Sequence, residues 1–250
     1  MSNIRDRVSA EEWKIRVDLA AAYRLVAHFG WTDLVFTHIS ARVPGPEHHF
    51  LINPYGLLFE EVNASNLVKI DQDANIVLDT GFPVNPAGFT IHSAIHEARE
   101  DAKSVLHLHT ADGTAVSTLK EGLLPLNQTA QLIIGDLAYH DYEGVAFDHD
   151  ERPRLQRDLG EHSFMLLRNH GTLTVGASVG AAFTRMYFLE RACQMQVATL
   201  ASARELYPTA APVLEKNVMI GKMGVAAASE GLVWPALLRK LDRLDTSFRS

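Results

Sequence analysis

The chain has 250 residues, a formal net charge of −7 at pH 7, 47% hydrophobic residues and 21% charged residues. These values are typical of a globular protein with a sizeable core, and the negative charge offers no basic field for nucleic acid. The single cysteine, Cys193, excludes an internal disulfide framework. The polar N-terminus resembles no signal peptide and no apolar run reaches membrane-spanning length, so we expect a cytoplasmic protein.

The first part of the chain predicts one helix followed by short strands. Ser9 and Glu12 have the spacing of a capping box, and apolar residues then recur at helical spacing as far as Gly30. Residues 34–53 favour a hairpin of short extended segments. Residues 67–78 favour two more strands.

The remaining chain alternates strands and helices, without a repeat or a change of composition that would mark a second domain. We therefore expect one domain over residues 1–250, with a core at about 13–203 and a helical tail at 204–250, in which helices pack on a mostly antiparallel sheet. The predicted helices span about 90–99, 113–120, 178–203 and an amphipathic segment from Trp234 to Leu244; the predicted strands lie at about 104–109, 132–139 and 164–175.

Three histidines form the most informative pattern. His107 and His109 are two residues apart at the end of an apolar run, so on a strand both point to the same side of the sheet. His170 ends a second strand-like run and precedes Gly171, which permits a sharp turn. Three neutral imidazoles around one point suit a divalent transition metal with positions left open for substrate. A pair of this spacing also arises by chance, so the motif needs its structural context.

A series of motifs in the same order gives that context. From Trp13 to Ala203 the chain resembles the class II aldolase/adducin family, in particular its adducin-head-like branch. The resemblance implies a three-layer α/β/α fold with a central antiparallel sheet, and a homotetramer with active sites at subunit interfaces. It also implies that His107, His109 and His170 are the metal ligands, usually for zinc, with manganese or iron as alternatives. The motifs lie at residues 52–58, 85–93, 107–110, 122–125, 138–142 and 167–171.

The sequence departs from the family pattern at the catalytic carboxylate. Family aldolases carry this acid before the helix that holds His92, whereas residues 86–89 here read Pro-Ala-Gly-Phe. The nearest acids in the sequence are Asp79 and Glu97. Removing a proton beside a carbonyl requires a base within reach, so standard aldol cleavage by the family mechanism is not expected.

The residues that bind phosphate in family aldolases also differ. Thr37-His38 replaces Gly-Asn, Asn53 replaces Thr, Tyr55 replaces Ser, and Ala87-Gly88 replaces a serine pair. Backbone amides could still bind an anion, and a protonated His38 could add charge. We expect His38, Asn53, Gly88 and Arg168 to bind a carboxylated or aromatic substrate rather than a sugar phosphate. Arg168 could instead be an ordinary ion-paired strand residue.

Residues 139–142, Tyr-His-Asp-Tyr, are the densest group of proton-transfer side chains outside the metal motif. His140 is therefore the candidate catalytic residue, since an adjacent carboxylate can fix its tautomer. The alternative is a surface loop whose groups bond one another. His92 and His96 are spaced to share one helix face, and packing or support of the site is favoured over metal binding.

These features favour a metal-dependent carbon–carbon lyase acting on a small keto or hydroxy acid or an aldol-type substrate. Decarboxylation is attractive because it forms an enolate-like species without first removing a C–H proton. Two alternatives remain: a non-haem iron oxygenase, and an adducin-like scaffold without catalysis. The chain ends in a short amphipathic segment and has no basic tail of the kind through which adducins bind the cytoskeleton.

Overall fold

The computed structural model describes residues 4–145, 149–224 and 230–250. Within these residues eight strands form one sheet, in the order β4-β3-β2-β1-β5-β8-β7-β6. Only β6 and β7 run parallel among the described neighbours, so the predicted mostly antiparallel sheet is confirmed. The strands are β1 (His38–Arg42), β2 (Phe50–Ile52), β3 (Val68–Ile70), β4 (Ile76–Leu78), β5 (Ser104–Leu108), β6 (Leu137–His140), β7 (Phe164–Leu167) and β8 (Gly171–Gly176).

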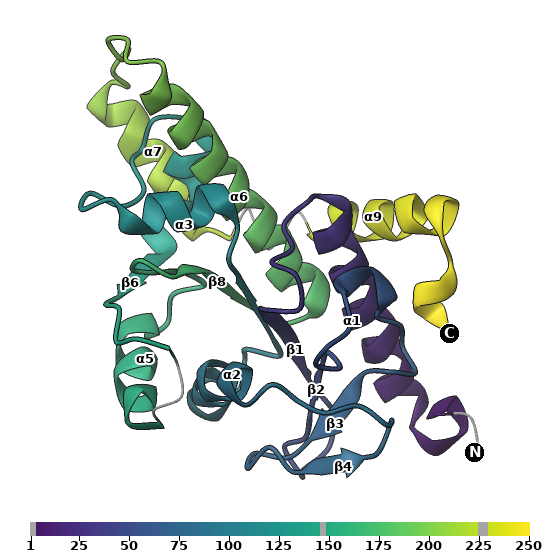
Figure 1. Cartoon of the computed structure of the whole chain (residues 1–250). Coiled ribbons are helices and arrows are strands. Elements are labelled where there is room, and N and C mark those ends of the chain that lie inside the picture. The colour runs from purple at the N-terminus through teal and green to yellow at the C-terminus, as the bar shows by residue number, and fades with distance from the viewer. Residues whose placement is uncertain (1–3, 146–148, 225–229) are drawn as a thin grey trace.

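Helices cover both faces of this sheet, as Figure 1 shows. The α-helices are α1 (Ala10–His28), α2 (Pro86–Ala98), α3 (Ala111–Thr118), α4 (Gln128–Ile133), α5 (Arg152–Leu159), α6 (Val179–Ala201), α7 (Ala211–Lys222) and α9 (Glu230–Leu244). Short 3-10 turns are η1 (Ile4–Arg7), η2 (Phe59–Glu61), η3 (Ile134–Asp136), η4 (His149–Glu151) and η5 (Ser247–Arg249). None of the described helices is both long and apolar enough to span a bilayer.

Alternate residues of β5 point into two different cores. Leu106 packs with α1, α6 and α9 on one face, whereas Val105 packs with α2 and α5 on the other. This alternation is the ordinary geometry of a strand that is buried on both sides. The predicted three-layer α/β/α architecture is therefore confirmed, and His107 lies on the α2 face together with Val105.

The first helix begins where the sequence predicts, with half of the expected capping box. The Ser9 hydroxyl accepts a hydrogen bond from the Glu12 amide at 3.1 Å. The Glu12 carboxylate does not return to Ser9; it accepts from the buried Arg16 at 2.9 Å and from Lys69 at 2.9 Å. A buried guanidinium needs a charged partner more than an exposed amide does, which explains the difference.

The strand predicted at residues 132–139 is wrong over its first half. Residues Gln128–Ile133 form α4, the turn η3 follows, and only Leu137–His140 is a strand. The Asn127 side chain caps α4 by accepting from the Ala130 amide at 3.0 Å. A short apolar run fits a buried helix as well as a buried strand, so periodicity alone could not separate the two.

Candidate metal centre

The three predicted ligands converge at one end of the sheet. His107 lies near the end of β5, His109 follows that strand, and His170 lies in the turn between β7 and β8. One ring nitrogen from each histidine falls within 4.8 Å of those of the other two. Strand β5 pairs with β8, which brings residues about sixty positions apart in the sequence to the same point.

Hydrogen bonds fix which nitrogen of each strand histidine faces the centre. His107 donates through Nδ1 to the Thr172 carbonyl at 3.1 Å, and His109 donates through Nδ1 to the Asp33 carboxylate at 3.0 Å. Their Nε2 atoms then carry lone pairs and lie 3.1 Å apart. Two lone pairs facing each other repel unless a cation lies between them. The donor set therefore fits a divalent metal, with a carbonyl and a carboxylate orienting the ligands.

Burial keeps two of these imidazoles in the neutral form that binds metal. The pKa of His107 is well below 6.5, because its ring is buried and because His170 and His109 are close. Burial, with smaller effects from His109 and His140, lowers the pKa of His170 to about 4. Neutral imidazoles need to lose no proton when they coordinate a metal.

A cavity of about 790 Å³ opens onto the three histidines, a size suited to a small molecule. Asp33 is the only acid among the described residues that line it, and these residues include no lysine or arginine. The cavity therefore combines the metal-binding nitrogens with neutral polar and apolar groups. Other lining residues include Thr37, His38, Tyr55, Asn85, Ile91, Thr110, Thr114, Tyr142 and Asn169.

Of the four predicted substrate-binding residues, one is among the described residues that line this cavity, and a second packs against that residue. His38 lines it, and Gly88, in the first turn of α2, packs against the His38 ring. A Cβ atom on Gly88 would fall 2.4 Å from Cδ2 of His38, so this contact requires glycine. Burial, and then the nearby imidazoles of His92, His109 and His170, hold the pKa of His38 well below 6.5, so His38 carries no charge at neutral pH.

The other two predicted binding residues make contacts elsewhere. Asn53 is buried, and its Oδ1 atom accepts a hydrogen bond from the Tyr23 hydroxyl at 2.9 Å. The Arg168 guanidinium donates to the Leu119 carbonyl at 2.6 Å and lies over the Tyr139 ring. Neither Asn53 nor Arg168 is among the described lining residues of the cavity.

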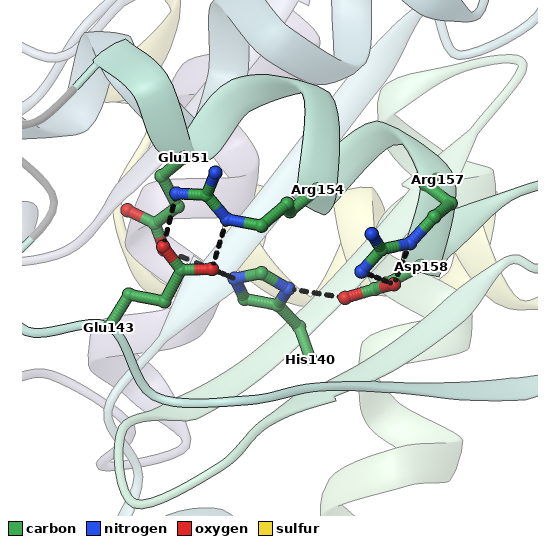
Figure 2. Close-up of polar contacts among 6 residues, drawn as sticks. All are labelled: His140, Glu143, Glu151, Arg154, Arg157 and Asp158. Carbon is green, nitrogen blue, oxygen red and sulfur yellow. Dashed lines mark hydrogen bonds and ion pairs between the residues drawn. The ribbon is translucent and has the colours of Figure 1, made fainter.

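His140, the predicted catalytic residue, lies in a cluster of charged side chains (Figure 2). Its Nδ1 is 2.8 Å from an Asp158 oxygen, and its Nε2 is 3.2 Å from a Glu151 oxygen. Glu143 lies 4.0 Å from Nε2. The ring is 3% exposed and does not line the cavity, whereas Tyr142, two residues later, does. This arrangement anchors the end of β6 to α5.

Three polar residues at the centre were not predicted from the sequence. Asp33 follows α1 and orients His109. Ser40 bridges His92 and His96 in the interior, at 2.6 Å and 2.7 Å. Glu190, in α6, accepts from Thr110 at 2.6 Å and from Thr172 at 3.0 Å, directly behind the metal ligands. Each contact joins residues at least 18 positions apart, so no local spacing indicates it.

The chain resembles known proteins in sequence and in fold. The family model for the class II aldolase and adducin N-terminal domain matches residues 17–197. The crystal structure of an aldolase II superfamily protein from Pseudomonas syringae is 51% identical, with a TM-score of 0.93 and full coverage of both chains. L-fuculose 1-phosphate aldolase from Glaciozyma antarctica PI12 is 29% identical, with a TM-score of 0.84, over 96% of this chain and 94% of its own.

Alpha-adducin of Mus musculus is 50% identical over 192 residues, which cover 76% of this chain and 26% of the adducin. The similarity thus spans aldolases along their whole length and the adducins along a part of theirs. Both its sequence and its fold assign this chain to the class II aldolase and adducin family.

Proposed function

We propose that this protein is a metal-dependent carbon–carbon lyase that acts on a small keto or hydroxy acid, with decarboxylation among its reactions. The observation that carries the proposal is the pair of Nε2 atoms of His107 and His109. They face each other at 3.1 Å while both Nδ1 atoms are engaged as donors. Two facing acceptor atoms are costly without a cation between them, so the arrangement supports a metal ion held beside an open cavity.

A divalent ion held by His107, His109 and His170 would polarise a carbonyl or hydroxyl oxygen and stabilise negative charge on it. The protein's own part is to hold the ligands in place. Asp33 and the Thr172 carbonyl fix the tautomers of two ligands, and Thr110 and Thr172 are in turn held by Glu190. These contacts come from four different segments of the chain, the two connections that hold Asp33 and Thr110 together with β8 and α6, and they hold the centre from several sides.

Proton transfer in the cavity is assigned to Tyr142 rather than to His140. The Tyr142 ring lies 6.2 Å from the His170 ring between centroids, and the side chain is about half exposed at the cavity. His140 serves as a positioning residue that anchors the strand leading into this segment. Cleavage of a carbon–carbon bond to a carboxylate needs no initial C–H deprotonation. This reaction suits the cavity because Asp33, the one acid among the described lining residues, already accepts a hydrogen bond from His109.

Zinc is the expected metal, with manganese and iron as alternatives, because imidazole ligands suit all three. We also propose a cytoplasmic homotetramer with active sites at subunit interfaces, which the family resemblance supports.

The proposal is tested with zinc-loaded and manganese-loaded protein and a panel of 2-keto and 2-hydroxy acids, with carbon dioxide and aldehyde release as readouts. We expect metal-dependent turnover of at least one acid. This turnover should be lost in the His107→Ala/His109→Ala variant and kept in His162→Ala, which changes an exposed histidine outside the cavity. Oxygen uptake that requires iron would favour the oxygenase instead. A stable oligomer that neither binds metal nor turns over any acid would favour the scaffold.

A further inference from the structure

A buried chain of hydrogen bonds leads from the cavity into the space between the sheet and α2. His38 Nδ1 lies 3.0 Å from His92 Nε2, and His92 Nδ1 lies 2.6 Å from the Ser40 hydroxyl. The same hydroxyl lies 2.7 Å from His96 Nε2, and His96 Nδ1 ends the chain at the Ala102 carbonyl, 2.9 Å away. All four side chains are at least 95% buried. The proton on each link is therefore set by the protein rather than by water.

The far end of this chain fixes its direction. A carbonyl oxygen can only accept, so His96 carries a proton on Nδ1. A second proton, on Nε2 of His96, would reverse the direction of every other hydrogen bond in the chain. His96 is neutral, however, because it is 1% exposed and because the Arg42 guanidinium donates to the backbone carbonyl of His96. Burial, and then the charge of Arg42, lowers the pKa of His96 to about 3. His96 Nε2 therefore accepts the proton of the Ser40 hydroxyl.

The remaining links follow from counting protons. The Ser40 hydroxyl has given its one proton to His96, so it accepts from Nδ1 of His92. His92 is buried and neutral, so its Nε2 has no proton and accepts from Nδ1 of His38. The consequence is a lone pair on Nε2 of His38. Among the described residues this atom has no hydrogen-bond partner.

The surroundings of His38 select what this lone pair can bind. His38 lines the cavity that holds the three metal-binding histidines, but is not one of that set. Its ring fills the space beside the first turn of α2, since a Cβ on Gly88 would fall 2.7 Å from Nε2. The positive end of that helix, an ordinary position for an anion, is thus occupied by the imidazole. The described lining residues include no lysine or arginine that could bind an anion in place of this helix end.

We propose that His38 is a specificity-determining residue that accepts a hydrogen bond, at Nε2, from a neutral hydroxyl group of the substrate, and that this position rejects a phosphate. A phosphate dianion presents only acceptor oxygens, which the lone pair repels, whereas a hydroxyl donates. The inference rests on the proposed function, because the three histidines define the end of the cavity where the substrate reacts. The substrate is then a hydroxylated, unphosphorylated acid.

The tautomer is measured directly by NMR of the full-length zinc-loaded protein labelled with 15N-histidine, with His38 assigned from the His38→Asn spectrum. We expect a proton on Nδ1 and none on Nε2. Ser40→Ala removes the central link and should give His38 a mixture of tautomers. Ser104→Ala removes a neighbouring buried hydroxyl that donates to the Ser40 carbonyl, outside the chain, and should leave His38 unchanged. A proton on Nε2 in the wild type would overturn the inference.

The specificity is measured with a matched pair of probes, glycerate and 3-phosphoglycerate, titrated into the zinc-loaded protein. Both are 2-hydroxy acids, and they differ in a terminal hydroxyl or phosphate. We expect the wild type to bind glycerate about tenfold more tightly or better, and His38→Asn, whose amide can donate, to lose most of that preference. Equal or tighter binding of 3-phosphoglycerate by the wild type, or no binding of either acid, would overturn the inference. Failure to retain zinc would overturn the proposed function, while the NMR result decides the His38 tautomer without any added ligand.

Discussion

Replacing Glu190 with glutamine should remove a specific part of the pH dependence of folding. The Glu190 carboxyl is 3% exposed in α6 and accepts hydrogen bonds from Thr110 and Thr172, the residues that follow two of the metal-binding segments. Burial dominates over these bonds and raises the pKa of Glu190 to about 7 from an ordinary value of 4.5. Glutamine has a similar shape, and its amide can accept from one threonine and donate to the other, so the substitution removes the charge and reverses one hydrogen bond.

The sign and size of the effect follow from linkage. Because the folded-state pKa is raised, the unfolded chain releases the proton first. The stability contributed by this group is full below pH 4.5 and is lost as the pH rises through 7. A difference of about 2.5 pKa units corresponds to about 3 kcal/mol over the whole window, of which about 2.5 kcal/mol falls between pH 5 and pH 8.

The measurement is urea unfolding of wild type and Glu190→Gln at pH 5, 6, 7 and 8, at one protein concentration and with a chelator present. The free energy of unfolding of Glu190→Gln minus that of the wild type should rise by about 2.5 kcal/mol from pH 5 to pH 8. Glu215→Gln, at an exposed position of α7, should give a flat difference. A flat difference for Glu190→Gln as well would refute the assignment of this pKa shift to burial.

Three further substitutions test other parts of the centre. Asp33→Asn keeps the shape of the side chain but weakens the bond to Nδ1 of His109, and should reduce zinc affinity about tenfold in a competition titration, without unfolding the protein. Gly88→Ala drives a Cβ into the His38 ring and should lower the free energy of unfolding by about 1–3 kcal/mol, whereas Gly231→Ala, with open space around its Cα, should not lower it; equal effects would contradict the close contact. His140→Gln removes the imidazole ring that lies between Asp158 and Glu151 and should lower the melting temperature while KM stays unchanged. A large rise in KM with no loss of stability would instead indicate that His140 binds the substrate.

The sequence predicted the long helices because the patterns that specify them are local, whereas the three layers were implied by the family resemblance. The capped apolar stripe of α1 and the long apolar face of α6 are complete within single segments. The strand prediction was wrong for the segment before β6 because α4 is only six residues long. An apolar run of that length fits a buried strand as well as a buried helix. The Asn127 cap of α4 is the one local signal that could have revealed it.

The metal ligands were predictable for a different reason. His107 lies in β5 and His109 directly follows that strand, two residues further on, so their convergence needs only the period of an extended chain. The contacts that orient them depend on how the strands pair. His38 faces His107 only through the register between β1 and β5, and the link from Ser40 to His92 follows from the docking of α2 on that face. The sequence could place His38 near the site, but not assign it a tautomer or a neutral charge.

The metal content of the purified protein tests the central claim most directly. The three converging histidines predict one divalent transition metal ion per chain by mass spectrometry, in wild type and in His162→Ala, and none in His107→Ala/His109→Ala. All three proteins should remain folded by circular dichroism. A wild-type protein that is folded, carries no metal and takes up neither zinc, manganese nor iron when these are supplied would contradict the claim.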